Sequence, residues 1–197
     1  SSFLTTLGAA TDVVNSKTNN GAAWLSDESD WKINFKNSQS DSIYVFCWSA
    51  ANAWINAHPA LIAIHLGAGD SQTVSFAEGF SGACSSADSG MKLDDGLISN
   101  TWAEFTFTPT YGVFDVSREV NLDGSSISMQ GSQCLSDMNT CVFKCGGGAT
   151  SCISGYVLEN CSASNGGGSG VDTAGNGGAS GGCMMGASGE SIDVTFG

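Results

Sequence analysis

Basic residues are scarce in this 197-residue chain, which has 6 Lys and Arg against 19 Asp and Glu. The resulting net charge of −13 argues against a nucleic-acid binder, because such proteins need a basic face that displaces counterions from phosphates. An anionic membrane surface would also repel the chain, so we do not expect membrane binding. An acidic surface suits an extracellular solute, a neutral sugar polymer or a basic partner.

Long apolar runs are also missing. The longest mostly apolar stretch, from Ala60 to Leu66, is far shorter than the roughly 20 residues that span a bilayer. The sequence has no initiator Met and no signal peptide, and its start at Ser1 resembles a mature form after processing. We therefore expect a secreted, extracellular protein.

Eight cysteines are present, an even number with loop-like spacing: Cys47, Cys84, Cys134, Cys141, Cys145, Cys152, Cys161 and Cys183. In a chain with few charges and many Gly and Ser, this pattern predicts four disulfides and no free thiol. A metal cluster is the rival interpretation, but the chain has no CxxC pair and both histidines lie far from the later cysteines. We expect no metal site, and we expect Cys47 to pair with Cys84 because the other six cluster later.

The first 30 residues differ from the rest. Apolar residues recur at steps of three and four from Phe3 to Val14, which is a helical period, until Asn19-Asn20-Gly21 interrupts it. This pattern predicts a short packing helix in an N-terminal arm of residues 1–30. A membrane-active helix would usually carry several basic residues on its polar face, and here only Lys17 is available.

From residue 31 apolar and polar residues alternate, which indicates strands with one face toward solvent. The expected strands are 31–36, 43–48, 61–66, 72–76, 102–107, 113–120, 126–129 and 191–196. We predict that 33–36 and 43–48 pair as a hairpin across the turn at 38–41. Short strands separated by Gly, Ser, Asn and Asp indicate a mostly β protein, either an antiparallel β-sandwich or a barrel.

The later part of the chain is rich in Gly and Ser and holds six of the cysteines. Disulfides can hold a segment whose apolar content cannot, so we interpret 131–190 as a disulfide-rich Gly/Ser loop region and not as a second domain. The sandwich would then consist of 31–130 and 191–197. The whole chain, 1–197, is long enough for one domain with its own core and short for two.

Three segments resemble thaumatin-like proteins in their order along the chain. They are Ile33-Asn34-Phe35-Lys36-Asn37, Thr101-Trp102-Ala103-Glu104-Phe105-Thr106 and Phe114-Asp115-Val116-Ser117, the last followed by Leu122-Asp123-Gly124. The chain is also similar, more loosely, to small secreted fungal proteins described as effectors or allergen-like. The resemblance implies a thaumatin-like sandwich with an acidic cleft that faces sugar polymers. The chain departs from that family in having about half its cysteines and no counterpart of its cleft arginine.

The resemblance makes Glu104, Asp115 and Asp123 candidate catalytic residues. Glycosidic cleavage needs one protonated and one ionised carboxyl, and clustered carboxylates raise one another's pKa. Trp102 and Thr106 are candidate ligand-binding residues, because side chains two apart on a strand share the face of Glu104. The adjacent acids Asp94 and Asp95 are further candidate ligand-binding residues, because their charges would add to the negative electrostatic field of this cluster. The alternative is that these acids only solvate a surface or begin turns.

Three functions remain open at this stage. The first is a secreted effector or defence-type protein that binds a cell-wall glycan or a host protein through the acidic groove, with β-glucan a better expectation than pectin. The second is a weak endo-acting glycoside hydrolase in which Glu104 is the acid and Asp115 the ionised partner. The third is a membrane-perturbing toxin that uses the N-terminal helix. We expect a monomer, with no cofactor and no nucleic-acid partner.

Overall fold

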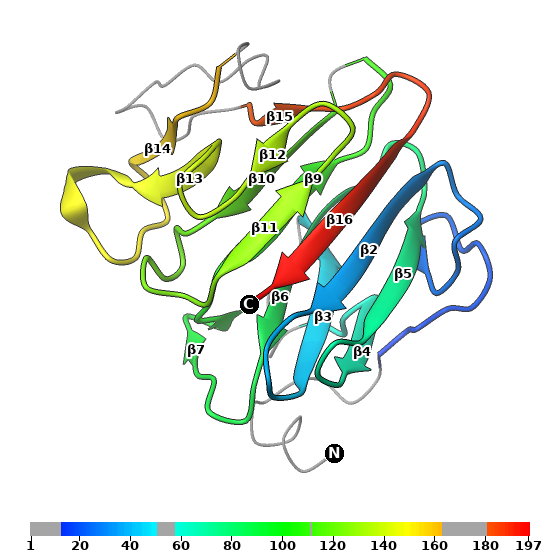
Figure 1. Cartoon of the computed structure of the whole chain (residues 1–197), viewed down its shortest axis with the longest axis horizontal. Helices are drawn as coiled ribbons and strands as arrows, with labels where there is room; N and C mark the ends of the chain where they lie inside the picture. The colour runs from blue at the N-terminus through cyan, green and yellow to red at the C-terminus, as the bar shows by residue number, and fades with distance from the viewer. Residues whose placement is uncertain (1–12, 51–57, 111, 163–180) are drawn as a thin grey trace.

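The computed structural model describes residues 13–50, 58–110, 112–162 and 181–197, and these residues form a mostly β protein (Figure 1). Strands β1–β16 make two large sheets and one small ribbon. Within the described ranges, no helix is long and apolar enough to cross a membrane.

The first sheet has six strands in the order β1-β5-β2-β16-β11-β12. Their bounds are β1 (Ala23–Trp24), β5 (Ser71–Phe76), β2 (Trp31–Asn37), β16 (Glu190–Phe196), β11 (Ile127–Gln130) and β12 (Leu135–Ser136). The C-terminal strand β16 lies between β2 and β11, so an early strand and the last strand of the chain lie side by side in the middle of this sheet (Figure 1). Along β2 every second side chain is buried, as the alternation in the sequence predicts.

The second sheet has eight strands, ordered β14-β13-β10-β9-β6-β3-β4, with β15 also pairing with β10. Their bounds are β14 (Tyr156–Glu159), β13 (Val142–Cys145), β10 (Val113–Ser117), β9 (Trp102–Thr106), β6 (Ser81–Ala87), β3 (Ile43–Ser49), β4 (Ile62–Leu66) and β15 (Cys183–Met184). The strands β7 (Leu93–Asp94) and β8 (Leu97–Ile98) form a separate two-stranded ribbon, and a 3-10 turn, η2 (Gly146–Gly148), follows β13.

One hydrophobic cluster joins the two sheets. Aromatic rings of β2 and β5 pack against rings at the end of β9. The ring centroids of Trp31 and Phe107 are 5.4 Å apart, and those of Phe76 and Phe105 are 4.9 Å apart. Such pairs are favourable beyond the apolar area that they bury. The Cys47–Cys84 disulfide lies in the same cluster and links β3 to β6, as the sequence predicts.

A second, smaller cluster covers the opposite face of the eight-stranded sheet. Its members are Phe46, Trp48, Ala60, Ala83, Ala87, Ile98 and Trp102, which alternate along the strands with residues of the main cluster. This sheet is therefore covered on both faces, and the ribbon residues Leu93 and Leu97 pack on the outer one. Glu104, one of the candidate residues from the sequence, belongs to this outer face.

The predicted hairpin between 33–36 and 43–48 is wrong. Strand β2 pairs with β5 and β16, whereas β3 pairs with β4 and β6 in the other sheet. The turn between them carries the chain from one sheet to the other, and the buried Asn37 holds it by donating Nδ2–H bonds to the carbonyls of Asp41 (2.8 Å) and Gly67 (3.0 Å). The sheets are also not purely antiparallel, since β16 runs parallel to β2 and β13 parallel to β10.

The predicted N-terminal helix falls mostly on residues 1–12, which lie outside the described residues. Residues 13–30 contain no helix and only the two-residue strand β1. Two successive turns interrupt any helix here. Asn19 Oδ1 accepts the backbone N–H of Gly21 at 2.9 Å, and Asn20 Oδ1 accepts that of Ala22 at 3.0 Å.

The predicted loop region at 131–190 is more ordered in its described parts than the composition suggests. It holds three of the four disulfides, and it also supplies β12 to one sheet and β13, β14 and β15 to the other. The Gly/Ser run at 163–180 lies outside the described residues.

Candidate functional site

A pocket of about 430 Å³ opens on the outer face of the eight-stranded sheet, over β6, β9 and β10. Its lining includes Glu104 of β9 and Asp115 of β10, which are direct cross-strand partners. Cross-strand partners share a face of the sheet and have Cβ atoms about 4.5–5.5 Å apart. The two predicted carboxyls are therefore neighbours in one pocket and do not lie on opposite faces.

Asp115 is the more deeply placed of the two. Its side chain is 5% exposed, and its buried Oδ1 has no hydrogen-bond partner among the described residues. Burial raises the pKa of Asp115 well above its usual range, and the nearby carboxyls of Glu104 and Glu119 raise it further. Burial also raises the pKa of Glu104 to about 7. Both groups accordingly favour the protonated form in mildly acidic solution.

A third carboxyl, that of Glu119, was not among the residues singled out in the sequence. Burial, followed by repulsion from Glu104, raises the pKa of Glu119 to about 8, although a hydrogen bond from the Ser117 hydroxyl (3.4 Å) opposes the shift. The Glu119 carbonyl accepts the N–H of Cys152 at 2.9 Å, within the loop that the Cys145–Cys152 disulfide closes. The period of two gave no signal for Glu119, because β10 ends at Ser117 and Glu119 lies in the bend that follows.

Hydroxyl groups and a tryptophan complete the pocket wall. Thr106 and Ser81 line it, and their hydroxyls hydrogen-bond to each other at 2.7 Å. Trp102 lines it too, as expected from its shared face with Glu104, and its indole N–H donates to the Ile98 carbonyl at 3.0 Å. Because Trp102 is only 3% exposed, it forms part of the wall and is not an open stacking surface.

The other predicted acids lie outside this pocket. Asp123 is on an exposed turn whose amide N–H donates to Asn121 Oδ1 at 3.0 Å, and it lines a separate hollow beside Arg118. Asp94 accepts the Ser151 hydroxyl at 3.0 Å, and Asp95 occupies a turn with a φ of 47°. None of these three acids is among the residues that line the pocket of Glu104. Asp95 and Asp123 lie in turns, and Asp94 ends strand β7.

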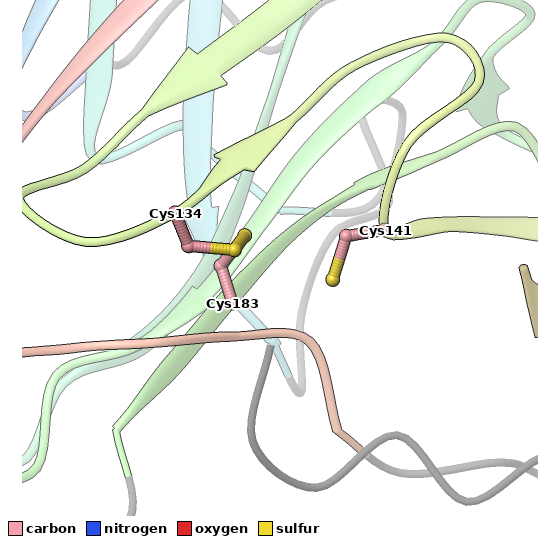
Figure 2. Close-up of side chains that lie close together, drawn as sticks. All are labelled: Cys134, Cys141 and Cys183. Carbon is pink, nitrogen blue, oxygen red and sulfur yellow. A yellow bond between two sulfur atoms is a disulfide. The ribbon is translucent and has the colours of Figure 1, made fainter. Parts of the chain in front are cut away.

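All eight cysteines form disulfides, as the even count predicts: Cys47–Cys84, Cys134–Cys183, Cys141–Cys161 and Cys145–Cys152. Three sulfurs lie within 4.8 Å of one another, those of Cys134, Cys141 and Cys183. Figure 2 shows the Cys134–Cys183 bond and, beside it, the side chain of Cys141. A metal ion would need thiolates at these positions, and all three sulfurs are already bound in disulfides.

Comparison with known proteins gives three results. The structure of a thaumatin-like xylanase inhibitor is similar with a TM-score of 0.44 and 10% identity, over 83% of this chain and 97% of that one. No curated protein matches the chain. The model of the Allergen Asp f 4-like domain matches residues 23–180, and these include every strand from β1 to β14. The chain therefore belongs to the family of Allergen Asp f 4-like domains.

Proposed function

We propose that this chain is a secreted effector or defence-type protein with a thaumatin-like sandwich, and that it binds a cell-wall glycan in the pocket formed by Glu104 and Asp115. The observation that carries the proposal is the direct pairing of these two carboxyls beside the hydroxyls of Ser81 and Thr106. Four disulfides fit an oxidising, extracellular compartment. The pocket volume lies in the range of small-ligand sites.

The protonation of the site favours binding over hydrolysis. Glycosidic cleavage needs one carboxyl protonated and another ionised at the same pH. Here burial raises the pKa of all three neighbouring carboxyls, so it singles out none of them as the ionised partner. Protonated carboxyls donate and accept hydrogen bonds, and these are the contacts that sugar hydroxyls make. The chain has a net charge of −13, so it would repel a polymer that carries ionised acid groups.

A pulldown at pH 5 tests this function. The intact protein is incubated with insoluble β-glucan, with chitin before and after deacetylation, and with a pectin gel, and the bound fraction is measured. We expect retention on at least one matrix without acid groups and none on pectin. A protein that binds no polysaccharide, or binds pectin best, would contradict the proposal. The control is Glu78→Gln, in an exposed turn between β5 and β6 that does not line the pocket.

Weak hydrolysis is the second candidate, because the pKa of Glu104 at about 7 suits a general acid. Incubation of β-glucan oligomers with the protein from pH 4 to pH 9, followed by reducing-end analysis, decides between the two functions. Product that disappears in Glu104→Gln would establish catalysis. Binding without product at every pH leaves Glu104 as a binding group only.

A further inference from the structure

Among the residues that the structure describes, the lining of the carboxyl pocket includes no Lys, Arg or His. Two carboxyls elsewhere in the described chain are compensated: Glu159 pairs with Lys144 at 2.9 Å, and Glu190 accepts three hydrogen bonds from Ser132 and Gly186. In the pocket, by contrast, buried acids face one another without a cation.

Buried charges are normally paired, since an unpaired one loses its hydration with nothing in return. Asp115 departs from this rule most clearly, because it is 95% buried by surface area and its Oδ1 lacks a partner. Asp115 lines the pocket, so a ligand seated there brings a donor close to this unpartnered oxygen. A positively charged donor would satisfy it and relieve the repulsion among the neighbouring carboxyls.

We propose that the pocket recognises a protonated amine on a sugar, so that the glycan is an amino-sugar polymer whose ammonium group lies between Glu104 and Asp115. This inference rests on the proposed function and specifies its ligand. The Ser81–Thr106 hydroxyl pair offers partners for sugar hydroxyls beside the carboxyls. An N-acetylated sugar would present a neutral amide at the same place and would leave the Asp115 oxygen without a charged partner.

A divalent cation fits these residues less well than an ammonium group. Calcium takes about six to eight oxygens at about 2.3–2.6 Å, which requires a compact set of ligands. In the described part of the chain, the one set of three metal-type side chains with ligand atoms within 4.8 Å of one another is the cysteine set. Glu104, Asp115 and Glu119 therefore do not form such a compact set, whereas a ligand with one cationic group and several hydroxyls does not require one.

Binding should release protons, because carboxyls that are protonated in the free protein must ionise to face an ammonium group. The titratable groups concerned are Glu104 on β9, Asp115 on β10, Glu119 after β10 and Tyr156 on β14, whose pKa is raised mainly by burial and further by the charges of Glu119 and Glu104. A neutral glycan would release none. Proton release therefore separates the two ligand classes independently of affinity.

The test is isothermal titration calorimetry of the full chain at pH 6 in two buffers with different ionisation enthalpies. The probes are a short glucosamine oligomer, its fully N-acetylated form, a β-glucan oligomer of equal length, a lysine oligomer and calcium chloride. We expect the glucosamine oligomer to bind at least tenfold more tightly than either neutral oligomer, with release of about one proton per bound amine. Glu104→Gln and Asp115→Asn should each weaken it at least tenfold, and Glu78→Gln less than twofold.

Each remaining outcome overturns the inference. Equal weakening by Glu78→Gln means that surface charge alone attracts the amine, and tighter binding of a lysine oligomer makes the ligand a basic peptide. Stoichiometric calcium binding that Asp115→Asn removes makes the pocket a metal site. Preferential binding of β-glucan refutes the amine but leaves the proposed glycan function intact, whereas no binding of any oligomer refutes both. Melting curves confirm that each variant is folded, and both substitutions keep the side-chain shape.

Discussion

The acidic pocket should make the protein more stable in acid than at neutral pH. Glu104 has its pKa raised from 4.5 to about 7 in the folded state, mainly by burial. A group whose folded pKa is raised stabilises the protein fully below its unfolded pKa and loses that contribution as the pH rises through the folded pKa. At 1.36 kcal/mol per pKa unit, the loss for Glu104 between pH 4.5 and pH 8 is about 3 kcal/mol. Glu119 acts in the same direction through its pKa of about 8.

The effects of Glu104 and Glu119 overlap because each carboxyl is part of the other's environment, so their sum exceeds the true loss. For a chain of this size about 3 kcal/mol corresponds to a fall in Tm of about 6–12 °C. Scanning calorimetry at pH 4.5, 6, 7 and 8.5 measures it. Glu104→Gln should flatten the profile and raise the Tm at pH 8, whereas Glu78→Gln should keep the wild-type slope. A Tm that rises from pH 4.5 to pH 8.5, or equal slopes for the two variants, would refute the reasoning.

Three further predictions concern the framework. Replacing Cys47 and Cys84 together by Ala should cost about 2–4 kcal/mol in denaturant unfolding, because the disulfide joins β3 to β6 in the main cluster; an unchanged midpoint would contradict this. Asn37→Ala should cost about 1–3 kcal/mol by the same assay, since it leaves buried carbonyls without donors, and Asn34→Ala on the solvent side of β2 is the control. Removal of residues 190–197 should abolish cooperative unfolding in near-ultraviolet circular dichroism, because it empties the middle of the six-stranded sheet; a sharp transition would refute this.

Alternation along the chain predicted most strands but not their neighbours. The pattern at Trp31, Ile33 and Phe35 identifies the buried face of β2, and the structure confirms it. It contains no information on pairing, so 43–48 was assigned to β2 by proximity in sequence, although the partners of β2 are β5 and the distant β16. The turn chemistry of 38–41 is compatible with a hairpin and with a passage between sheets. The contacts of Asn37 with Leu66 and Gly67 select the second, and they are long-range.

Strand β6 escaped prediction for a different reason. Its sequence, Ser81–Ala87, consists of small residues and one cysteine, with neither alternation nor large apolar side chains. Small residues are needed there because the strand is buried on both faces, between the main cluster and the aromatic cover of Trp48 and Trp102. Gly82 illustrates the constraint: an added Cβ would lie 2.8 Å from the Trp48 carbonyl oxygen. Composition alone assigns such a segment to a loop.

The candidate site was predictable where it follows strand geometry. Glu104 and Asp115 lie on strands that could be recognised, and their direct pairing brings the two carboxyls together. Asp123 became a candidate through the resemblance to thaumatin-like proteins. It lies on a turn, however, and lines a different hollow of the surface. Glu119 lies beyond the end of β10 and depends on the loop closed by Cys145 and Cys152, a contact that sequence spacing does not reveal.

The pocket and the disulfide framework are two parts of one physical arrangement. Unpaired buried carboxyls destabilise a fold, so they persist where the surrounding structure is over-determined. Strand β10, which carries Asp115, is held by β9 on one side and by β13 and β15 on the other, and β15 is tied to the rest by the Cys134–Cys183 disulfide. A site preorganised in this way keeps its acceptors in place without a ligand and loses little entropy on binding. The same side chains that lower stability at neutral pH are therefore those expected to bind the glycan, and a variant such as Glu104→Gln should gain stability and lose affinity together.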